Sequence, residues 1–156
     1  MNTALKTAEY ILDYCGYNFI MNCSNKKLQK LLYYVQAWTL AYTGKRYFND
    51  DIEAWLHGPV VPDVYHKYKE FGFDRIEIGE RDFDDKIFTE NNLLNSILKH
   101  YCEYDADYLE MRTHIEAPWK EARKNGARII TPKSMREYYK SVLDNYEQKK
   151  KQLCNT

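Results

Sequence analysis

Long apolar runs are missing from this 156-residue sequence, and so is the apolar stretch that opens a secreted protein. No segment reaches the ~18 uncharged apolar residues that a membrane-spanning helix needs. The first residues already carry Lys6 and Glu9 and show no small-residue cleavage site of a signal peptide. We therefore expect a cytoplasmic protein with no membrane partner.

Cysteine is scarce, and Cys15, Cys23, Cys102 and Cys154 lie far apart along the chain. None of them forms a CxxC pair, and none lies beside a histidine at a zinc-ligand spacing. This pattern favours a reduced protein with buried or idle thiols and no metal. A disulfide between two of the four stays open, because connectivity cannot be read from spacing.

Catalytic motifs are missing as well. The sequence has no phosphate-binding glycine run, no G-x-S-x-G elbow and no H-E-x-x-H zinc helix. We therefore expect no enzymatic activity and no cofactor. The alternative is that Glu53, His57, His114 and Glu116 gather in space as an acid–base or metal cluster. The interpretation we prefer is that each histidine fixes a turn through one hydrogen bond.

Net charge is zero, but the charges are unevenly distributed. Residues 73–110 carry 4 basic and 11 acidic side chains, whereas residues 111–156 carry 11 and 5. Because phosphate contacts dominate nucleic-acid affinity, a neutral chain argues against a general nucleic-acid binder. The acidic middle and the basic end either pair with each other or face a partner of opposite charge and steer its approach.

The patterns that are present indicate one compact, mainly α-helical domain of about six helices. Apolar residues make up 44% of the chain, which is enough for a core. The helices are predicted from helical spacing of apolar residues between caps and stops. They lie at 3–15, 24–44 and 62–71, then begin at Thr89, at Asp105 or Asp107, at Pro118 and at Thr131-Pro132. We expect the domain to span residues 1–148, followed by a basic, flexible tail at 149–156.

The helix between Ser24 and Gly44 is the clearest prediction, because serine is a good N-cap and glycine a natural stop. Its lysines, Lys26, Lys27 and Lys30, are expected on a solvated face, so Lys30→Ala should be nearly silent for stability. Its core face is expected to hold Leu28, Leu31, Leu32, Val35, Trp38, Thr39 and Tyr42.

Tyrosine is abundant, with fifteen in the chain. Tyr42 falls on the core face, whereas Tyr33, Tyr34 and Tyr47 are less clearly inward. Tyrosine is enriched in protein interfaces. It also stacks on single-stranded bases, but that requires a basic groove, for which residues 1–72 offer little net charge.

After Gly44 the apolar period changes. Ile52, Ala54 and Leu56 alternate with polar or aromatic residues, which predicts a small β element around residues 51–57. Residues 75–79 and 86–88 are candidate edge strands.

The last helix is basic. Its charged residues Lys133, Arg136 and Lys140 are spaced so that two or three share a face. Phosphate contact is one interpretation. The one we prefer is a solvated face, or pairing with the acidic residues 80–90. Its apolar face is expected to hold Met135, Tyr138, Tyr139, Val142 and Leu143.

Three sequence blocks resemble the Panacea (SocA-like, GepA-like) antitoxin domain. The stretch 28–34 with Ala37-Trp38 resembles its "K-L-x-K-L-L-Y-Y-x-Q" opening. Residues 51–62 with Val64-Tyr65 resemble its "IEAW-x-x-GPV-x-x-x-VY" signature, and residues 113–119 with Ala122-Arg123 resemble "TH-x-E-x-PW-x-x-AR". The blocks occur in the family's order and, with their flanks, cover roughly residues 5–145.

The resemblance implies an antitoxin that neutralises a cognate protein toxin by direct binding, in a type II-like toxin–antitoxin system. Relatives occur in phages and prophages. One relative acts instead as an adaptor that delivers its toxin to the ClpXP protease, so proteolytic delivery is an alternative. A second alternative, from a different class, is a nucleic-acid-binding regulator that uses the basic last helix.

The residues that carry the resemblance are also the candidate site. Several of them lie at the end of an element, where binding groups usually occur. An equally weighted alternative is that they only hold the strand against the helices. The candidate partner-binding residues are Trp55, His57, Gly58, Pro59, Val60, Tyr65, His114, Pro118 and Trp119.

Overall fold

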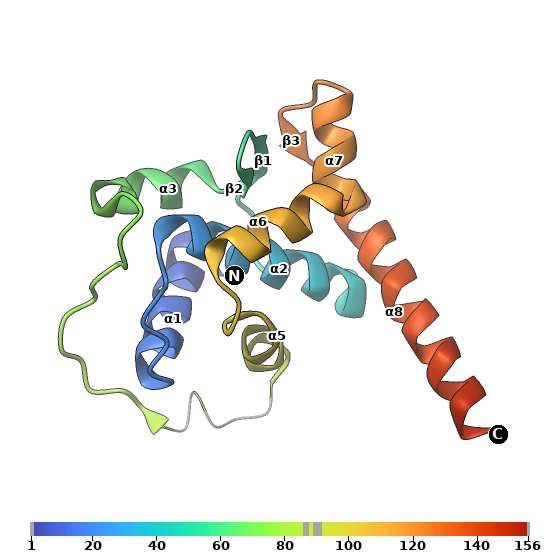
Figure 1. The fold of residues 1–156 in the computed structure, drawn as a ribbon, viewed down its shortest axis with the longest axis horizontal. Helices are drawn as coiled ribbons and strands as arrows, with labels where there is room; N and C mark the ends of the chain where they lie inside the picture. Colours follow the sequence, from blue (N-terminus) through green and yellow to red (C-terminus); the bar gives the residue numbers. More distant parts are fainter. Residues whose placement is uncertain (1, 86–87, 89–91, 156) are drawn as a thin grey trace.

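A computed structural model describes residues 2–85, 88 and 92–155 and confirms a mainly helical fold. Helices hold more than half of the residues, and a small three-stranded sheet packs among them (Figure 1). Seven α-helices and one 3-10 turn lie in the described part of the chain. The α-helices are α1 (Ala4–Tyr17), α2 (Asn25–Thr43), α3 (Pro62–Tyr68), α5 (Leu93–Tyr101), α6 (Ala106–Ile115), α7 (Ala117–Lys124) and α8 (Pro132–Cys154), and η1 is Lys69–Phe71.

The predicted ends of α2 and the predicted start of α8 are confirmed. The Ser24 side chain accepts a hydrogen bond from the backbone N–H of Lys27, and Gly44 follows the last turn with a left-handed φ of 72°. The side chain of Thr131 accepts one from the N–H of Ser134 at 3.1 Å. These contacts satisfy backbone groups that a helix end leaves free.

Helix α2 lies at the centre of the fold, surrounded by α1, α5, α6 and α8 (Figure 1). The predicted placement of its tyrosines is therefore wrong. Tyr33 and Tyr34 are fully buried, whereas Tyr42 is 54% exposed. A central helix packs on all sides, so its buried residues do not follow a single stripe.

The sheet has the strand order β2-β1-β3 and is antiparallel throughout. The strands are β1 (Ile52–Trp55), β2 (Gly58–Val60) and β3 (Ile129–Ile130). The predicted β element is confirmed at β1, but its partner β3 was not expected. A two-residue strand has too few positions to show an alternating pattern. Leu56 lies beyond the end of β1 and is exposed rather than inward.

Several boundaries differ from the expected ones. Asn92 caps α5, accepting from the N–H of Asn95 at 2.9 Å, while Thr89 lies outside the described residues. Residues 75–79 form no strand, although Arg75 makes one isolated bridge with Ser24. The candidate strand at 86–88 lies mostly outside the described part of the chain.

Helix α8 is the longest and projects from the body of the molecule toward the C-terminus (Figure 1). Met135 and Tyr139 are buried against α2, as expected. Val142, expected inward, is 37% exposed, whereas Leu143 beside it is partly buried. The helix runs on to Cys154, through most of the 149–156 segment that we expect to be a flexible tail.

Three of the four cysteines, Cys15, Cys23 and Cys102, are buried free thiols, and Cys154 is exposed. In the described residues no helix combines the length and the apolar character needed to cross a membrane.

Candidate functional site

The turn between β1 and β2 sits directly on α2. Gly58 ends the turn with a φ of 110°, which disfavours residues with a side chain. A Cβ at this position would lie 2.5 Å from Cε of Lys30 and 3.1 Å from Oγ1 of Thr113. Only glycine allows the hairpin backbone to approach α2 and α6 this closely.

Two polar side chains of α2 hold this hairpin from below. Nζ of Lys30 donates to the carbonyl of Pro59 at 3.2 Å, and Oε1 of Gln29 accepts from the N–H of Val61 at 2.8 Å. Lys30 is almost completely buried, and burial lowers its pKa to about 7, although the nearby Glu110 carboxylate acts in the opposite direction.

The expected solvated face of lysines is therefore wrong. Lys27, like Lys30, is fully buried, and its Nζ donates to the side chain of Asn22 and to the carbonyl of Cys102. Lys26 is partly covered and pairs with Asp107 on α6. Neighbouring helices cover this side of α2, so its lysines become internal hydrogen-bond donors.

Glu110 of α6 links the hairpin to α2. Its carboxylate pairs with Nδ1 of His57 at 3.0 Å and with Nζ of Lys26. Burial alone would raise the pKa of Glu110, but hydrogen bonds from Lys26 and His57 hold it below its usual value. The exposed His57 thus fixes the turn through one contact, as the preferred interpretation of the histidines expects.

Trp119 of α7 supports β1 from the other side. Its indole N–H donates to the carbonyl of Trp55 at 2.8 Å, and its ring stacks on His114 at 3.9 Å between centroids. Nη1 of Arg123 donates to the carbonyl of Ala54 at 3.2 Å. Burial lowers the pKa of His114, whose buried Nε2 has no hydrogen-bond partner in the described residues. His114 therefore departs from the interpretation that each histidine fixes a turn through one hydrogen bond, and it acts through its stacked ring instead. These contacts make Trp119 and His114 supports of the strand.

Glu116 has a different role. It is buried, and its two carboxylate oxygens accept hydrogen bonds from the hydroxyls of Tyr34 and Tyr139, each at 2.6 Å. Burial raises the pKa of both tyrosines. The cluster joins α2, the start of α7 and α8. Glu53 accepts a hydrogen bond from Nε1 of Trp55 at 2.7 Å. The four residues considered as an acid–base cluster therefore make separate contacts.

No group of three or more histidine, cysteine, aspartate or glutamate side chains that could hold a metal occurs in the described ranges.

A cleft of about 410 Å³ opens beside the hairpin, and we call it the Trp55 cleft. The rings of Trp55 and Tyr65 meet edge to face at 5.0 Å and form one wall. Two large apolar side chains at its rim face solvent, with Leu56 65% and Phe73 91% exposed. The residues that line it are Asn25, Lys26, Gln29, Lys30, Trp55, Leu56, His57, Val60, Tyr65, Lys69, Gly72 and Phe73.

The structure divides the candidate residues into two groups. Trp55, His57, Val60 and Tyr65 line the cleft. The other five support it: Gly58, Pro59 and Pro118 are buried, and His114 and Trp119 pack behind β1.

The cleft also contains residues that the sequence analysis missed. Gln29 and Lys30 form its floor, and their signal was the first block of the resemblance, where polar residues stand among leucines. Leu56 and Phe73 complete the rim. The alternation placed Leu56 within the predicted β element, and nothing in the sequence set Phe73 apart.

The combination of a central helix, a small three-stranded sheet and surrounding helices defines a small, mainly helical domain. The model of the antitoxin SocA-like, Panacea domain matches residues 28–120, which is more than half of the chain. The chain belongs to this family. No curated protein and no solved structure matches it. All three blocks of the resemblance fall within the matched residues, apart from the last Ala122-Arg123 pair.

Proposed function

We propose that this protein is an antitoxin that neutralises a cognate protein toxin by direct binding, and that the Trp55 cleft is the contact surface. The observation that carries the proposal is the exposure of Leu56 and Phe73 at the rim of a cleft built from the family's central block. Exposed apolar groups beside a cleft are typical of protein interaction sites.

The rigidity of the hairpin supports this assignment. Lys30 and Gln29 hold the backbone of Pro59 and Val61 from below, and Trp119 holds Trp55 from behind. A surface that is held in place before binding loses little conformational entropy when the partner arrives. The buried residues of the family signature therefore hold its exposed residues in position for binding.

The test takes a small protein encoded next to this gene as the candidate toxin. It measures rescue of growth during co-expression of the two proteins and their binding after purification. Leu56→Asp and Phe73→Asp change exposed side chains, so both variants are expected to fold. Losing an apolar side chain that anchors a partner typically weakens binding by at least about thirtyfold. Both variants should lose rescue.

Phe19→Asp is the matched control, because Phe19 is an equally large residue that is 84% exposed and does not line the cleft. It should rescue like the parent. Loss of rescue by all three variants, or by none, would contradict the assignment of the contact surface.

Trp55 and Trp119 are expected to behave differently from each other. Trp119→Ala removes a support of β1, so rescue should fall in step with melting temperature. Trp55→Ala removes a wall of the cleft and should lose binding at a melting temperature closer to that of the parent. If instead Trp119→Ala lost binding at the parent melting temperature and Trp55→Ala lost rescue only through instability, the interface would lie at α7.

Delivery of the toxin to a ClpXP-type protease is the alternative route. It predicts that toxin levels fall when the antitoxin is expressed and recover in cells without the protease. Direct neutralisation predicts rescue at unchanged toxin levels. Both routes need the contact surface, so the cleft variants do not distinguish direct neutralisation from proteolytic delivery. The cellular level of the toxin distinguishes them.

A further inference from the structure

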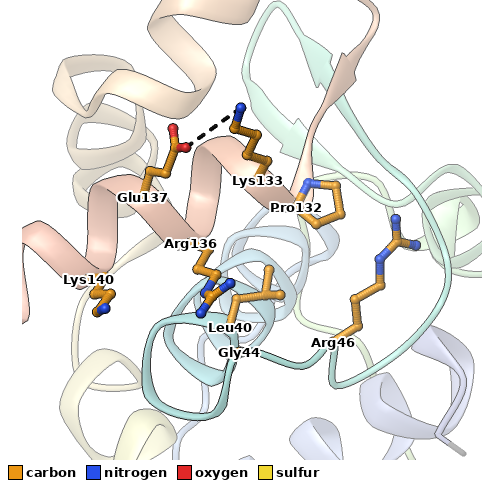
Figure 2. A pocket seen from close by; sticks show the side chains of 8 residues that line it. All are labelled: Leu40, Gly44, Arg46, Pro132, Lys133, Arg136, Glu137 and Lys140. Atoms are coloured by element: carbon orange, nitrogen blue, oxygen red, sulfur yellow. Dashed lines mark ion pairs between the residues drawn. The ribbon is translucent and has the colours of Figure 1, made fainter.

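A second cleft, of about 650 Å³, lies where the start of α8 crosses the end of α2, and we call it the basic cleft (Figure 2). It is outside the Trp55 cleft and shares no residue with it. It is lined by Leu40, Gly44, Arg46, Pro132, Lys133, Arg136, Glu137 and Lys140.

The charges of this cleft are not compensated. Its one carboxylate, Glu137, pairs with Lys133 at 3.9 Å, on the side of α8 away from α2 (Figure 2). Arg136 and Lys140 project on the other side, and neither makes an ion pair or hydrogen bond with any residue that the structure describes. Arg46 joins them from the loop after α2, and in the described part of the chain it donates to the carbonyl of Asn49 alone. Three cations therefore face the same cleft.

The sequence analysis preferred a solvated face, or pairing with the acidic residues 80–90. Lys133, Arg136 and Lys140 are exposed, as a solvated face requires, but pairing with residues 80–90 does not account for them. Figure 1 shows the described part of that segment on the far side of the molecule from α8. Its Arg81 pairs with Asp13 of α1 at 2.8 Å. The chain is neutral overall but presents a basic end at α8 and an acidic end at the opposite side.

We infer that the basic cleft binds an acidic segment of a protein partner. Arginine forms paired hydrogen bonds with carboxylates. The guanidinium of Arg136 lies against Gly44 at the end of α2, and among the described residues it donates to none, so its donors are available for this purpose. Leu40 and Pro132 give the cleft an apolar lining, which suits side-chain carbon atoms next to the carboxylates. The inference shares with the proposed function only that the partner is a protein.

A nucleic acid fits this surface less well. A phosphate backbone needs basic side chains along a continuous track. On α8 the cations of the cleft are followed by Asp144 and Glu147 before the next lysines, so the track is interrupted.

The test uses a fluorescein-labelled hexaglutamate peptide and fluorescence anisotropy, with no toxin present. The double variant Arg136→Gln/Lys140→Gln is compared with Lys149→Gln/Lys150→Gln, which makes the same change in charge on exposed residues of the same helix outside the cleft. Losing two charge-assisted contacts should weaken peptide binding about tenfold in the first variant. The second should change it less than about twofold, the effect of distant charge alone.

Several results would overturn the inference: no binding of the peptide, equal weakening by the two variants, or tighter binding of a thymidine oligonucleotide with the same loss in the first variant. Sedimentation that shows a dimer dissociated by Arg136→Gln/Lys140→Gln would assign the cleft to a second copy of this chain instead. Because the Leu56 and Phe73 variants leave the basic cleft intact, they should bind the peptide normally, so this assay and toxin rescue fail independently.

Discussion

Helices α2 and α8 are built from similar residues but lie in opposite environments. Both begin at a hydroxyl cap, and both carry several lysines and tyrosines. In α2 most of these side chains are buried and hydrogen-bonded, with Tyr42 as the exposed exception, whereas in α8 most of them face solvent beyond the second turn. The difference shows that neighbouring elements, more than residue type, decide whether a lysine is internal or a binding group on the surface.

The largest expected difference between the two helices concerns an introduced charge. Leu32→Asp places an unpaired carboxylate among the helices that surround α2 and should destabilise the fold by more than about 4 kcal/mol, enough to unfold it. Val142→Asp on the exposed part of α8 should change stability by less than about 1 kcal/mol. Thermal melting followed by circular dichroism measures both. Similar melting temperatures would show that α2 is not the centre of the core.

Lysine removal should give the next largest difference. Lys30→Ala leaves a cavity under Gly58 and removes the donor to Pro59, so it should cost about 2 kcal/mol or more. Lys140→Ala should stay within about 0.5 kcal/mol of the parent, because this side chain is exposed. Urea unfolding of the two variants gives the comparison. An unchanged free energy of unfolding in Lys30→Ala would show that Lys30 is solvated, as the sequence pattern favours.

A single hydroxyl distinguishes the tyrosines of α8 from one another. Tyr139→Phe removes one of the two hydroxyl donors to the buried carboxylate of Glu116 and should cost about 1.5–3 kcal/mol. Tyr146→Phe removes an exposed hydroxyl and should be silent. Urea unfolding of the two variants measures this difference. An equal loss of unfolding free energy in both would show that the hydrogen bond to Glu116 does not stabilise the fold.

The smallest effect, counted per pH unit, is a pH dependence that Lys30 confers. Its pKa in the folded chain is about 7, below its ordinary value of 10.5, so the unfolded chain binds a proton that the folded chain lacks between these values. The free energy of unfolding should therefore rise with pH above about 7, by at most about 1.4 kcal/mol per unit. Lys30→Met keeps the stem of the side chain and removes the titrating group.

Unfolding free energies at several pH values between about 6 and about 9 test this slope. The parent should gain stability over this range relative to Lys30→Met. Parallel curves for the two proteins would mean that Lys30 stays protonated in the folded state, held by Glu110.

Local signals gave the helices of this fold with little error. Ser24, Gly44 and Thr131 mark helix ends through bonds that their own side chain or backbone makes within a few residues. Such bonds need no distant partner, so the sequence pattern is sufficient to find them. The β1 strand was found for the same reason, through its alternating residues.

The candidate site was found only in part. The turn at Trp55 and His57 was named because it belongs to the family signature, and these two residues do line a cleft. The role of Trp119 as a support, and the place of Lys30 in the floor, depend on contacts with residues far away in the chain. No periodicity records such contacts.

The sequence by itself determined the helical class, the helix ends around α2 and α8 and the membership of the Panacea family, because each depends on residue order over short distances. Only the tertiary structure decided which polar residues are internal. It placed Lys27, Lys30 and Glu116 inside, where packing supplies their partners, and it separated the basic end from the acidic segment by the width of the molecule. Burial is a property of what surrounds a residue, and several distant segments of the chain meet to produce it.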